Sequence, residues 1–213
     1  KGLATRIDRY IDETRIATEK RAYDEYGNVK EIQKPKAVAD NSGYSSKYVY
    51  DSNFHRAVIE EYEASPFRFR SVYGYDDLMR LVRITDPNGS VTEKKYDAFG
   101  RIAAETLPGD DLSAPTTAIS YDDSAFPRSV RVSAKDGTSD SLIAVSYLDG
   151  FGRTIQTKKE WTGGWATVDS WFDGSGRPWK ESAPYLSASA GYSSRDAAKP
   201  CSIVEYDELD RAV

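Results

Sequence analysis

The sequence predicts an all-β fold in which antiparallel β-hairpins follow one another and join into one curved, twisted sheet. A short motif that opens with an aromatic residue and contains Asp recurs eight times along the 213 residues, and strand-like runs flank each copy. The composition agrees, because Tyr contributes 15 residues and Met only one, and aromatic and β-branched residues favour pleated sheet. A chain of this length can bury a sizeable core.

The first copy, "YDEYGN", begins at Tyr23, and the last, "YDELDR", begins at Tyr206. We therefore expect residues 1–22 to form N-terminal strands leading into the array, and residues 23–213 to form one continuous domain of about eight repeats. The first ten residues lack the apolar segment of a signal peptide, and we expect the chain to be a fragment of a larger protein. The motif residues, all assigned a structural role, are Tyr23, Asp24, Gly27, Tyr50, Asp51, Arg56, Tyr75, Asp76, Arg80, Tyr96, Asp97, Gly100, Arg101, Tyr121, Asp122, Arg128, Tyr147, Asp149, Gly152, Arg153, Phe172, Asp173, Gly176, Arg177, Tyr206, Asp207 and Arg211.

The clearest copy, "YDAFGR" at residues 96–101, lies between the runs "SVTEKKY" and "IAAETL", which is the pattern of a hairpin. Asp accepts hydrogen bonds from main-chain amides a few residues ahead, and Gly adopts positive φ without steric cost. The motif therefore predicts a turn.

The residues that replace Gly in other copies test this prediction. His55 and Asp210 are of types enriched at positive φ, so they fit the turn. Pro127 cannot adopt positive φ, and its copy has two extra residues, so that turn must have another geometry. Met79 has no such explanation.

The Tyr that opens each copy is expected to pack on the neighbouring hairpin with its hydroxyl toward solvent. The Arg that closes the copy is expected to lie over that ring or to pair with the Asp of the next copy. These residues would then fix the register of successive hairpins.

The pattern Y-D-x-x-G-R, at steps of 21 to 34 residues, resembles the YD or Rhs repeat. Proteins with this repeat include bacterial Rhs proteins, SpvB-like proteins, the B and C components of insecticidal toxin complexes, and teneurins. The resemblance implies a segment of a spiralled β-shell that encloses a toxin segment, in a protein that is secreted or at the bacterial cell surface. It implies neighbouring repeats of the parent chain, an encapsulated toxin segment and other toxin-complex subunits as partners.

A second hypothesis is a module that binds carbohydrate or protein. The four tryptophans, Trp161, Trp165, Trp171 and Trp179, lie in one short stretch, and on one exposed face they would stack on sugar rings. The preferred alternative is that "TGG" forms a hairpin turn with Trp161 and Trp165 paired across it.

Signals for an enzyme are weak. His55 is the single histidine, and the acidic pairs Asp76-Asp77, Asp110-Asp111 and Asp122-Asp123 lack the facing geometry of glycosidase carboxylates and the spacing of a calcium loop. The single cysteine, Cys201, excludes an internal disulfide. We therefore expect no catalytic residue, no cofactor and no metal site.

Nucleic acid and membrane are not expected partners. The formal net charge is −5 and the basic residues are scattered, and no apolar run reaches the length of a membrane-spanning helix. Asn88-Gly89-Ser90 is a glycosylation sequon, but "DPNGS" is better explained as a two-residue hairpin turn. The segment 187–200 is expected to be a loop with a helical turn before Pro200.

Overall fold

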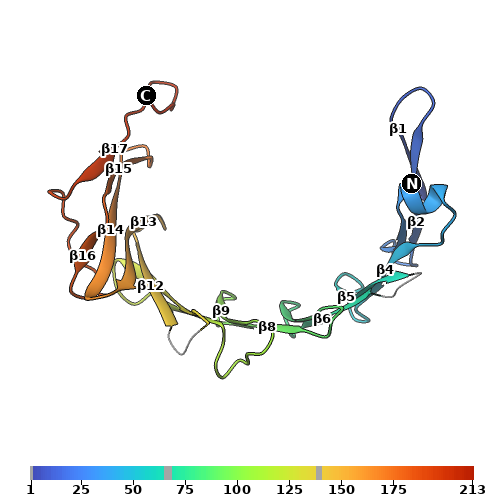
Figure 1. Ribbon diagram of the computed structural model, residues 1–213, viewed down its shortest axis with the longest axis horizontal. Coiled ribbons are helices and arrows are strands. Elements are labelled where there is room, and N and C mark those ends of the chain that lie inside the picture. Colours follow the sequence, from blue (N-terminus) through green and yellow to red (C-terminus); the bar gives the residue numbers. More distant parts are fainter. Residues whose placement is uncertain (1, 65–68, 138–140) are drawn as a thin grey trace. The chain divides into compact units, whose positions relative to one another are not determined.

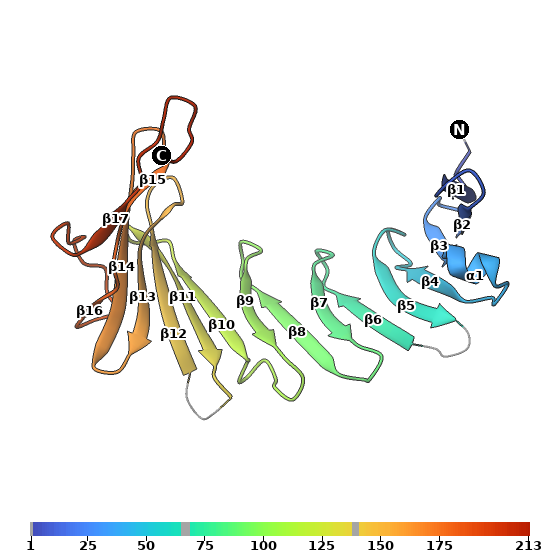
Figure 2. The same ribbon diagram turned by 45° about the horizontal axis from the view of Figure 1, so that its top comes forward.

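A computed structural model describes residues 2–64, 69–137 and 141–213. It divides into two compact units, Lys1–Lys95 with Thr106–Leu112, and Tyr96–Glu105 with Ser113–Val213. We call these the first and second units. Nearly every element is a β-strand (Figures 1 and 2).

The first unit is built from serial antiparallel strands, each paired with the next along the chain. One short helix, α1 (Pro35–Ala39), interrupts the series and begins at a proline, which is favoured in the first helical turn. The strands are β1 (Arg6–Tyr10), β2 (Ile16–Tyr23), β3 (Val29–Gln33), β4 (Ser45–Tyr50), β5 (Val58–Ala64), β6 (Phe69–Tyr75), β7 (Leu81–Thr85) and β8 (Val91–Tyr96).

The second unit continues the same pattern, with β9 to β15 paired in sequence order. Its last strands pair out of order, because β16 lies on β14 and β17 lies on β15. The strands are β9 (Ile102–Thr106), β10 (Thr117–Asp122), β11 (Arg128–Lys135), β12 (Ser141–Leu148), β13 (Thr154–Trp161), β14 (Gly164–Phe172), β15 (Pro178–Ser182), β16 (Tyr185–Ser187) and β17 (Cys201–Ile203).

The prediction of an all-β fold of serial antiparallel hairpins is therefore confirmed. Five hairpins also contain a β-bulge, which the sequence did not predict, where the first strand reaches the motif. In the β6–β7 hairpin, for example, Gly74 faces Arg83 but Tyr75 faces Leu81, so Val82 is the extra residue. The same shift occurs at Ala22/Tyr23, Val49/Tyr50, Tyr147/Leu148 and Trp171/Phe172. Bulges strengthen the local twist and re-aim the side chains beside them.

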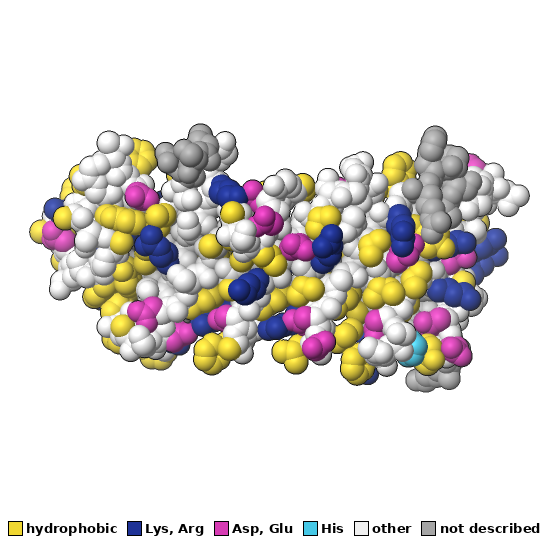
Figure 3. Space-filling model, turned by 90° about the horizontal axis from the view of Figure 1, so that it is seen from below, with side chains coloured by type: hydrophobic (Ala, Val, Ile, Leu, Met, Phe, Trp, Pro, Cys, Tyr) yellow, Lys and Arg dark blue, Asp and Glu magenta, His cyan; other side chains and the backbone are white. Residues whose placement is uncertain are grey.

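The faces of the first unit carry cross-strand ion pairs rather than a continuous apolar layer. Glu60 pairs with Arg70 and Arg83 pairs with Glu93, each at 2.8 Å. Figure 3 shows this mixture, with acidic and basic side chains next to one another among hydrophobic ones. Exposed pairs of this kind each contribute at most about 1 kcal/mol.

The apolar core lies in the second unit, where Val145, Tyr147 and Ile155 are buried and Trp165 and Phe172 pack against them. The predicted helical turn in segment 187–200 is wrong, because this segment contains no helix and only a turn near Lys199. The segment instead covers one face of the sheet. Tyr147 donates its hydroxyl hydrogen to the carbonyl oxygen of Ala190 in it, at 2.7 Å.

Candidate functional site

The recurrent element of the molecule is the turn formed by each motif copy. In the copy at residues 96–101, Oδ1 of Asp97 accepts hydrogen bonds from the main-chain N–H groups of Phe99 and Arg101, both at 2.9 Å. The N–H of Gly100 donates to the Asp97 carbonyl oxygen at 3.1 Å. The same carboxylate contacts recur at Asp24, Asp76, Asp149, Asp173 and Asp207.

The residue at the glycine position of the motif has positive φ in most copies. Gly27, Gly100, Gly152 and Gly176 have φ between 79° and 86°. His55, Met79 and Asp210 have φ of 54°, 59° and 61°. The expectation for His55 and Asp210 is therefore confirmed, and Met79 adopts the same conformation although its side chain does not favour it.

The fifth copy forms a different turn, as its proline predicts. The peptide bond between Phe126 and Pro127 is cis. Asp122 accepts hydrogen bonds from the N–H and the hydroxyl of Ser124, at 3.0 and 2.6 Å, instead of capping an amide four residues ahead.

The closing Arg binds the Asp of its own copy, a contact that was not expected from the sequence. Nε of Arg101 lies 2.7 Å from Oδ2 of Asp97, and equivalent pairs form at Arg80, Arg153, Arg177 and Arg211. The Asp carboxylate is thus shared between the main-chain amides and the guanidinium.

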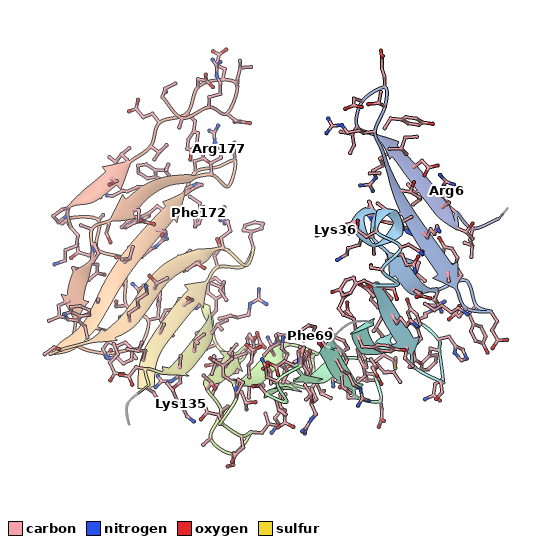
Figure 4. The ribbon with its side chains drawn as sticks, turned by 45° about the vertical axis from the view of Figure 1, so that its right-hand side comes forward. Arg6, Lys36, Phe69, Lys135, Phe172 and Arg177 are labelled. Atoms are coloured by element: carbon pink, nitrogen blue, oxygen red, sulfur yellow. The ribbon has the colours of Figure 1, made fainter. Side chains whose placement is uncertain are left out.

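The same Arg then reaches the next copy, but through groups other than those expected: the ring beneath it opens the next copy, and its acidic partner there is not the Asp that caps the turn. The guanidinium carbon of Arg101 lies 3.9 Å from the centre of the Tyr121 ring, and Arg101 also pairs with Asp123 at 2.8 Å. Arg153 lies over Phe172 and Arg177 over Tyr206, each at 4.5 Å, and Arg177 also pairs with Asp210. Figure 4 shows Phe172 and Arg177 at the same end of their hairpin.

The first copy has Asn28 where the others have Arg. Nδ2 of Asn28 donates to Oδ2 of Asp24 at 3.0 Å and to the carbonyl oxygen of His55 at 2.6 Å. His55 also stacks on Tyr26, with ring centroids 3.7 Å apart. Asn28 therefore performs both tasks of the Arg, one within its turn and one toward the next copy.

The prediction that the Tyr hydroxyl points to solvent is wrong. Tyr75 donates its hydroxyl hydrogen to the carbonyl oxygen of Val58, at 3.0 Å, where the second strand of the preceding hairpin begins. Tyr23, Tyr50, Tyr121 and Tyr206 make the equivalent bond to Ala4, Val29, Ile102 and Pro178, at 2.8 to 3.0 Å. Because the Tyr ring packs on the preceding hairpin, its hydroxyl reaches a main-chain carbonyl oxygen there. That oxygen accepts the hydrogen bond in place of water.

The electrostatics of the turns favour charged carboxylates. The N–H of Arg80 and the Arg80 guanidinium hold the pKa of Asp76 below its ordinary value, and Arg177 does the same for Asp173. At Asp51 the N–H groups of Phe54 and Ala57 lower the pKa. Hydrogen bonds to the charged form cause this direction of shift.

The tryptophans do not form one exposed face. Trp161 is opposite Gly164, and Trp165 is opposite Glu160, so Trp161 and Trp165 point to opposite faces of the sheet. Their predicted pairing is therefore wrong. A hairpin turn does form at this place, but it consists of Thr162 and Gly163 alone, because Gly164 already belongs to β14. Trp171 lies beneath Lys180 and Arg195, and Trp179 is the extra residue of a β-bulge.

The predicted two-residue turn at "DPNGS" is also wrong, because Thr85 pairs with Val91 and five residues lie between them. Asp86 caps this loop by accepting the N–H groups of Asn88 and Ser90, at 2.9 and 2.8 Å. The loop therefore copies the geometry of the motif turns at the opposite end of a hairpin.

A cluster of buried polar side chains lies beneath segment 187–200. Nζ of Lys158 donates to the Ser189 carbonyl oxygen and to Oγ of Ser193, both at 3.2 Å, and burial lowers the pKa of Lys158. Asp169 accepts from Gln156 at 2.6 Å and from the Tyr185 hydroxyl at 2.8 Å. Polar residues in a strand are typical of an exposed face, so this burial could not be predicted from the residue types.

These hydrogen bonds hold segment 187–200 against the sheet, and the buried polar side chains pair with one another or with that segment. Within residues 2–64, 69–137 and 141–213, no cluster of three or more His, Cys, Asp or Glu side chains has the arrangement of a metal site. No helix in the described part of the chain is long and apolar enough to span a membrane.

The comparisons with known proteins agree with this architecture. Residues 75–111 match the family model "RHS Repeat". No curated protein matches the sequence.

Solved toxin-complex structures have the same fold. The crystal structure of TcdB2-TccC3 superposes with a TM-score of 0.72 and 16% identity, covering 98% of this chain and 13% of that chain. The Photorhabdus luminescens Tc holotoxin pore superposes with a TM-score of 0.61 and 14% identity, covering 93% of this chain and 10% of that chain. This chain therefore spans between about a tenth and a sixth of the length of these matched chains.

Proposed function

We propose that this chain, a YD/Rhs-repeat protein, is a non-catalytic wall segment of a secreted or surface-delivered bacterial toxin assembly. Its partners are then neighbouring hairpins of the same parent chain, other toxin-complex subunits and the toxin segment that such a wall encloses. The boundaries predicted from the sequence, strands at 1–22 and an array at 23–213, remain part of this proposal.

The observation that carries the proposal is the use of the motif residues. In each regular copy the Asp carboxylate caps its own turn, as Asp97 illustrates. In five copies the Tyr hydroxyl binds main chain that precedes the copy, and Arg101, Arg153 and Arg177 contact the following copy. The most recurrent side chains are therefore committed to holding hairpins together, which is the task of a wall. The separation of Trp161 and Trp165 onto opposite faces removes the premise of a sugar-stacking platform.

The proposal is tested with a chimera of the TcdB2-TccC3 assembly. The stretch that superposes on this chain is replaced by residues 1–213, and protease digestion of the enclosed segment is followed by mass spectrometry. A closed wall predicts protection equal to that of the parental assembly. A chimera that assembles at the correct mass but leaves the enclosed segment open to digestion would contradict the proposal.

A Gly100→Val version of the chimera is the matched control. It disturbs one turn, so it is expected to admit protease at a site near that turn. Hydrogen exchange of the isolated chain establishes separately that the hairpins are folded.

A further inference from the structure

Gln156 of β13 contacts segment 187–200 in the way that one peptide group contacts another. Its Nε2 donates to the Ser193 carbonyl oxygen at 3.1 Å, and its Oε1 accepts the Ser193 N–H at 3.2 Å. Gln156 is fully buried. A single side chain therefore satisfies both main-chain groups of one residue, and this pairing does not depend on the side chain that the residue carries.

Four other side chains, from consecutive strands, also bind main-chain atoms of the segment. The pairs are Tyr147 of β12 with the Ala190 carbonyl oxygen, Lys158 of β13 with that of Ser189, Asp169 of β14 with the Asp196 N–H, and Lys180 of β15 with the Ala197 carbonyl oxygen, at 2.7 to 3.2 Å. The segment therefore crosses the sheet from β12 to β15. In Figures 1 and 2 the chain between β16 and β17 runs beside β14.

The side chains of the segment contribute fewer contacts than its main chain. Oγ of Ser193 lies 3.2 Å from Nζ of Lys158, and Arg195 donates to the Ser170 carbonyl oxygen at 2.7 Å. Residues 192–196 form no helix, strand or turn. Most of the segment's side chains are small, and those of residues 188, 189, 194, 197 and 198 are exposed. The sheet thus recognises mainly the main chain of an irregular, open stretch of polypeptide.

Detaching the segment would expose little apolar surface. The segment adds only a small side chain, Ala190, to the core around Tyr147. Beneath it lie Gln156, Lys158 and Asp169, which are residue types that water normally solvates. Burial disfavours the ammonium form of Lys158 and lowers its pKa. A part of a protein with few buried apolar contacts can open while the rest stays folded.

The covered face continues beyond the segment onto β10 and β11. Ser129 is opposite Tyr147, which is opposite Gln156, and residues paired in this way share a face. A hollow of about 360 Å³ opens there, lined from the sheet by Ser120, Ser129 and Arg131 and from the segment by Ala190 and Gly191. An incoming chain therefore has room on the same face, directly beside the segment.

We propose that the covered face binds the main chain of extended polypeptides, and that segment 187–200 occupies it as an exchangeable ligand from the same chain. The class of ligand follows from the contacts, because Tyr147, Gln156, Lys158, Asp169 and Lys180 all bind main-chain N–H or C=O groups. Another polypeptide that offers the same groups takes the place of the segment when it lifts. This binding activity goes beyond the proposed wall and does not depend on it.

The first experiment opens the site in the full chain. Ser193→Pro with Asp196→Pro removes the two main-chain N–H groups that bind Gln156 and Asp169. A fluorescent peptide with the sequence of residues 187–200 is then titrated and followed by anisotropy. It is expected to bind this opened variant at least about tenfold more tightly than the wild type, where the attached segment competes at a high effective concentration. An opened variant that does not bind the peptide would overturn the proposal.

Two modified peptides test whether the main chain is what the site recognises. N-methylation at the residue that corresponds to Ser193 removes its N–H and keeps its hydroxyl. This change is expected to lower the affinity at least about tenfold, because the buried Gln156 oxygen then lacks a partner. Ser193→Ala in the peptide keeps the N–H and is expected to cost less. A larger loss for Ser193→Ala would contradict recognition of the main chain.

A pair of substitutions in the opened variant locates the peptide. Gln156→Met keeps the volume of the side chain and removes its hydrogen bonds, so it should weaken binding at least about tenfold. Lys159→Met is the matched control on the same strand, because Lys159 is exposed on the opposite face. Circular dichroism verifies that both variants are folded. Equal affinities in the two variants would mean that the peptide binds elsewhere, and would refute this site.

Hydrogen exchange of the wild-type chain gives a test that needs no variant. The amides of Ser193 and Asp196 are expected to exchange faster than those of β12 and β13, which stay paired when the segment opens. Equal rates would mean that the segment opens only when the sheet unfolds, which rules out exchange with another polypeptide. The chimera test of the wall measures protease protection instead. Peptide binding without protection would contradict the wall alone, and protection without peptide binding would contradict this site alone.

Discussion

The hairpins of the first unit and those around β12 to β14 in the second unit share the same turns but differ in what covers them. In the described part of the first unit, Ala37 is the one hydrophobic residue that is fully buried. In the second unit, Val145, Tyr147 and Ile155 are buried together with Gln156, Lys158, Thr167 and Asp169. Strand pairing and turn contacts therefore keep the hairpins of the first unit in register without an apolar core, and in the second unit segment 187–200 covers additional polar side chains of the same framework.

The largest loss of folding stability is expected for a substitution beneath segment 187–200. Lys158→Ala leaves a cavity and removes one hydrogen-bond donor from each of Ser187 and Ser193, so it should lower the free energy of unfolding by about 2–5 kcal/mol. Lys158→Met keeps the volume and should cost clearly less. Urea unfolding of both variants is the measurement, with Arg83→Ala in the first unit as an exposed control that costs about 1 kcal/mol or less. Equal losses for Lys158→Ala and Arg83→Ala would contradict the contrast between the two regions.

A β-branched residue at the glycine position of a motif turn should destabilise the fold in either unit, because it resists positive φ. Gly100→Val places a β-branched residue at φ 81° and should cost about 1–2 kcal/mol. Gly100→Asn should cost less, because Asn tolerates this region. Thermal unfolding compares the two variants, and a melting temperature of Gly100→Val equal to that of the wild type would refute the turn assignment.

Removing a single Tyr hydroxyl tests the contact between hairpins. Tyr75→Phe deletes the hydrogen bond to the Val58 carbonyl oxygen and should cost about 0.5–1.5 kcal/mol. Tyr10→Phe, at an exposed position, is the control and should have no effect on urea unfolding. If Tyr75→Phe proves as stable as Tyr10→Phe, the Tyr75 hydroxyl does not contribute to the contact between hairpins.

Acid should weaken the turns in both units. The pKa values of Asp76, Asp173 and Asp207 are lowered in the folded chain, first by the N–H of the closing Arg. The stabilisation is therefore complete above the unfolded pKa of about 3.9, and it is lost as the pH falls through the folded values. Asp173→Asn should reduce the loss of melting temperature below about pH 4; an unchanged acid profile would argue against this linkage.

The smallest effect is expected at Met79, where a long side chain occupies φ 59°. Met79→Gly relieves the left-handed conformation but adds chain entropy to the unfolded state, so a net gain of about 0.5 kcal/mol is expected. Gly152→Met is the reciprocal variant and should lower the melting temperature. A loss of stability in Met79→Gly would mean that contacts of the Met79 side chain outweigh its backbone cost.

The turn itself could be predicted from the sequence because its chemistry is local. Asp97 and Gly100 are read directly from the spacing of the motif, and His55 and Asp210 follow from their tolerance of positive φ. The destination of the Tyr hydroxyl depends on a bond to another hairpin, such as that from Tyr75 to Val58, and the Arg reaches its own Asp before its neighbour's. Neither preference is visible in a single copy of the motif.

The covered face could not be predicted, for a different reason. Gln156, Lys158, Thr167 and Asp169 are residue types that normally face water, and their burial depends on segment 187–200 folding back over them. The nearest signal in the sequence is the unusually long step before the last motif copy. The separation of Trp161 from Trp165 follows from the register of a two-residue turn, which the position of the glycines in "TGG" did not determine.

The role of the motif residues in joining hairpins is tested by hydrogen exchange, followed by mass spectrometry, of an Arg101→Ala variant. Arg101 contacts Asp97 in its own turn, and Tyr121 and Asp123 in the next copy. If the motif residues hold successive hairpins together, exchange should accelerate in β10 and β11 as well as in the turn at 97–101. Acceleration confined to residues 97–101 would contradict the account, because the motif would then build isolated turns and leave the assembly of the hairpins to the strands alone.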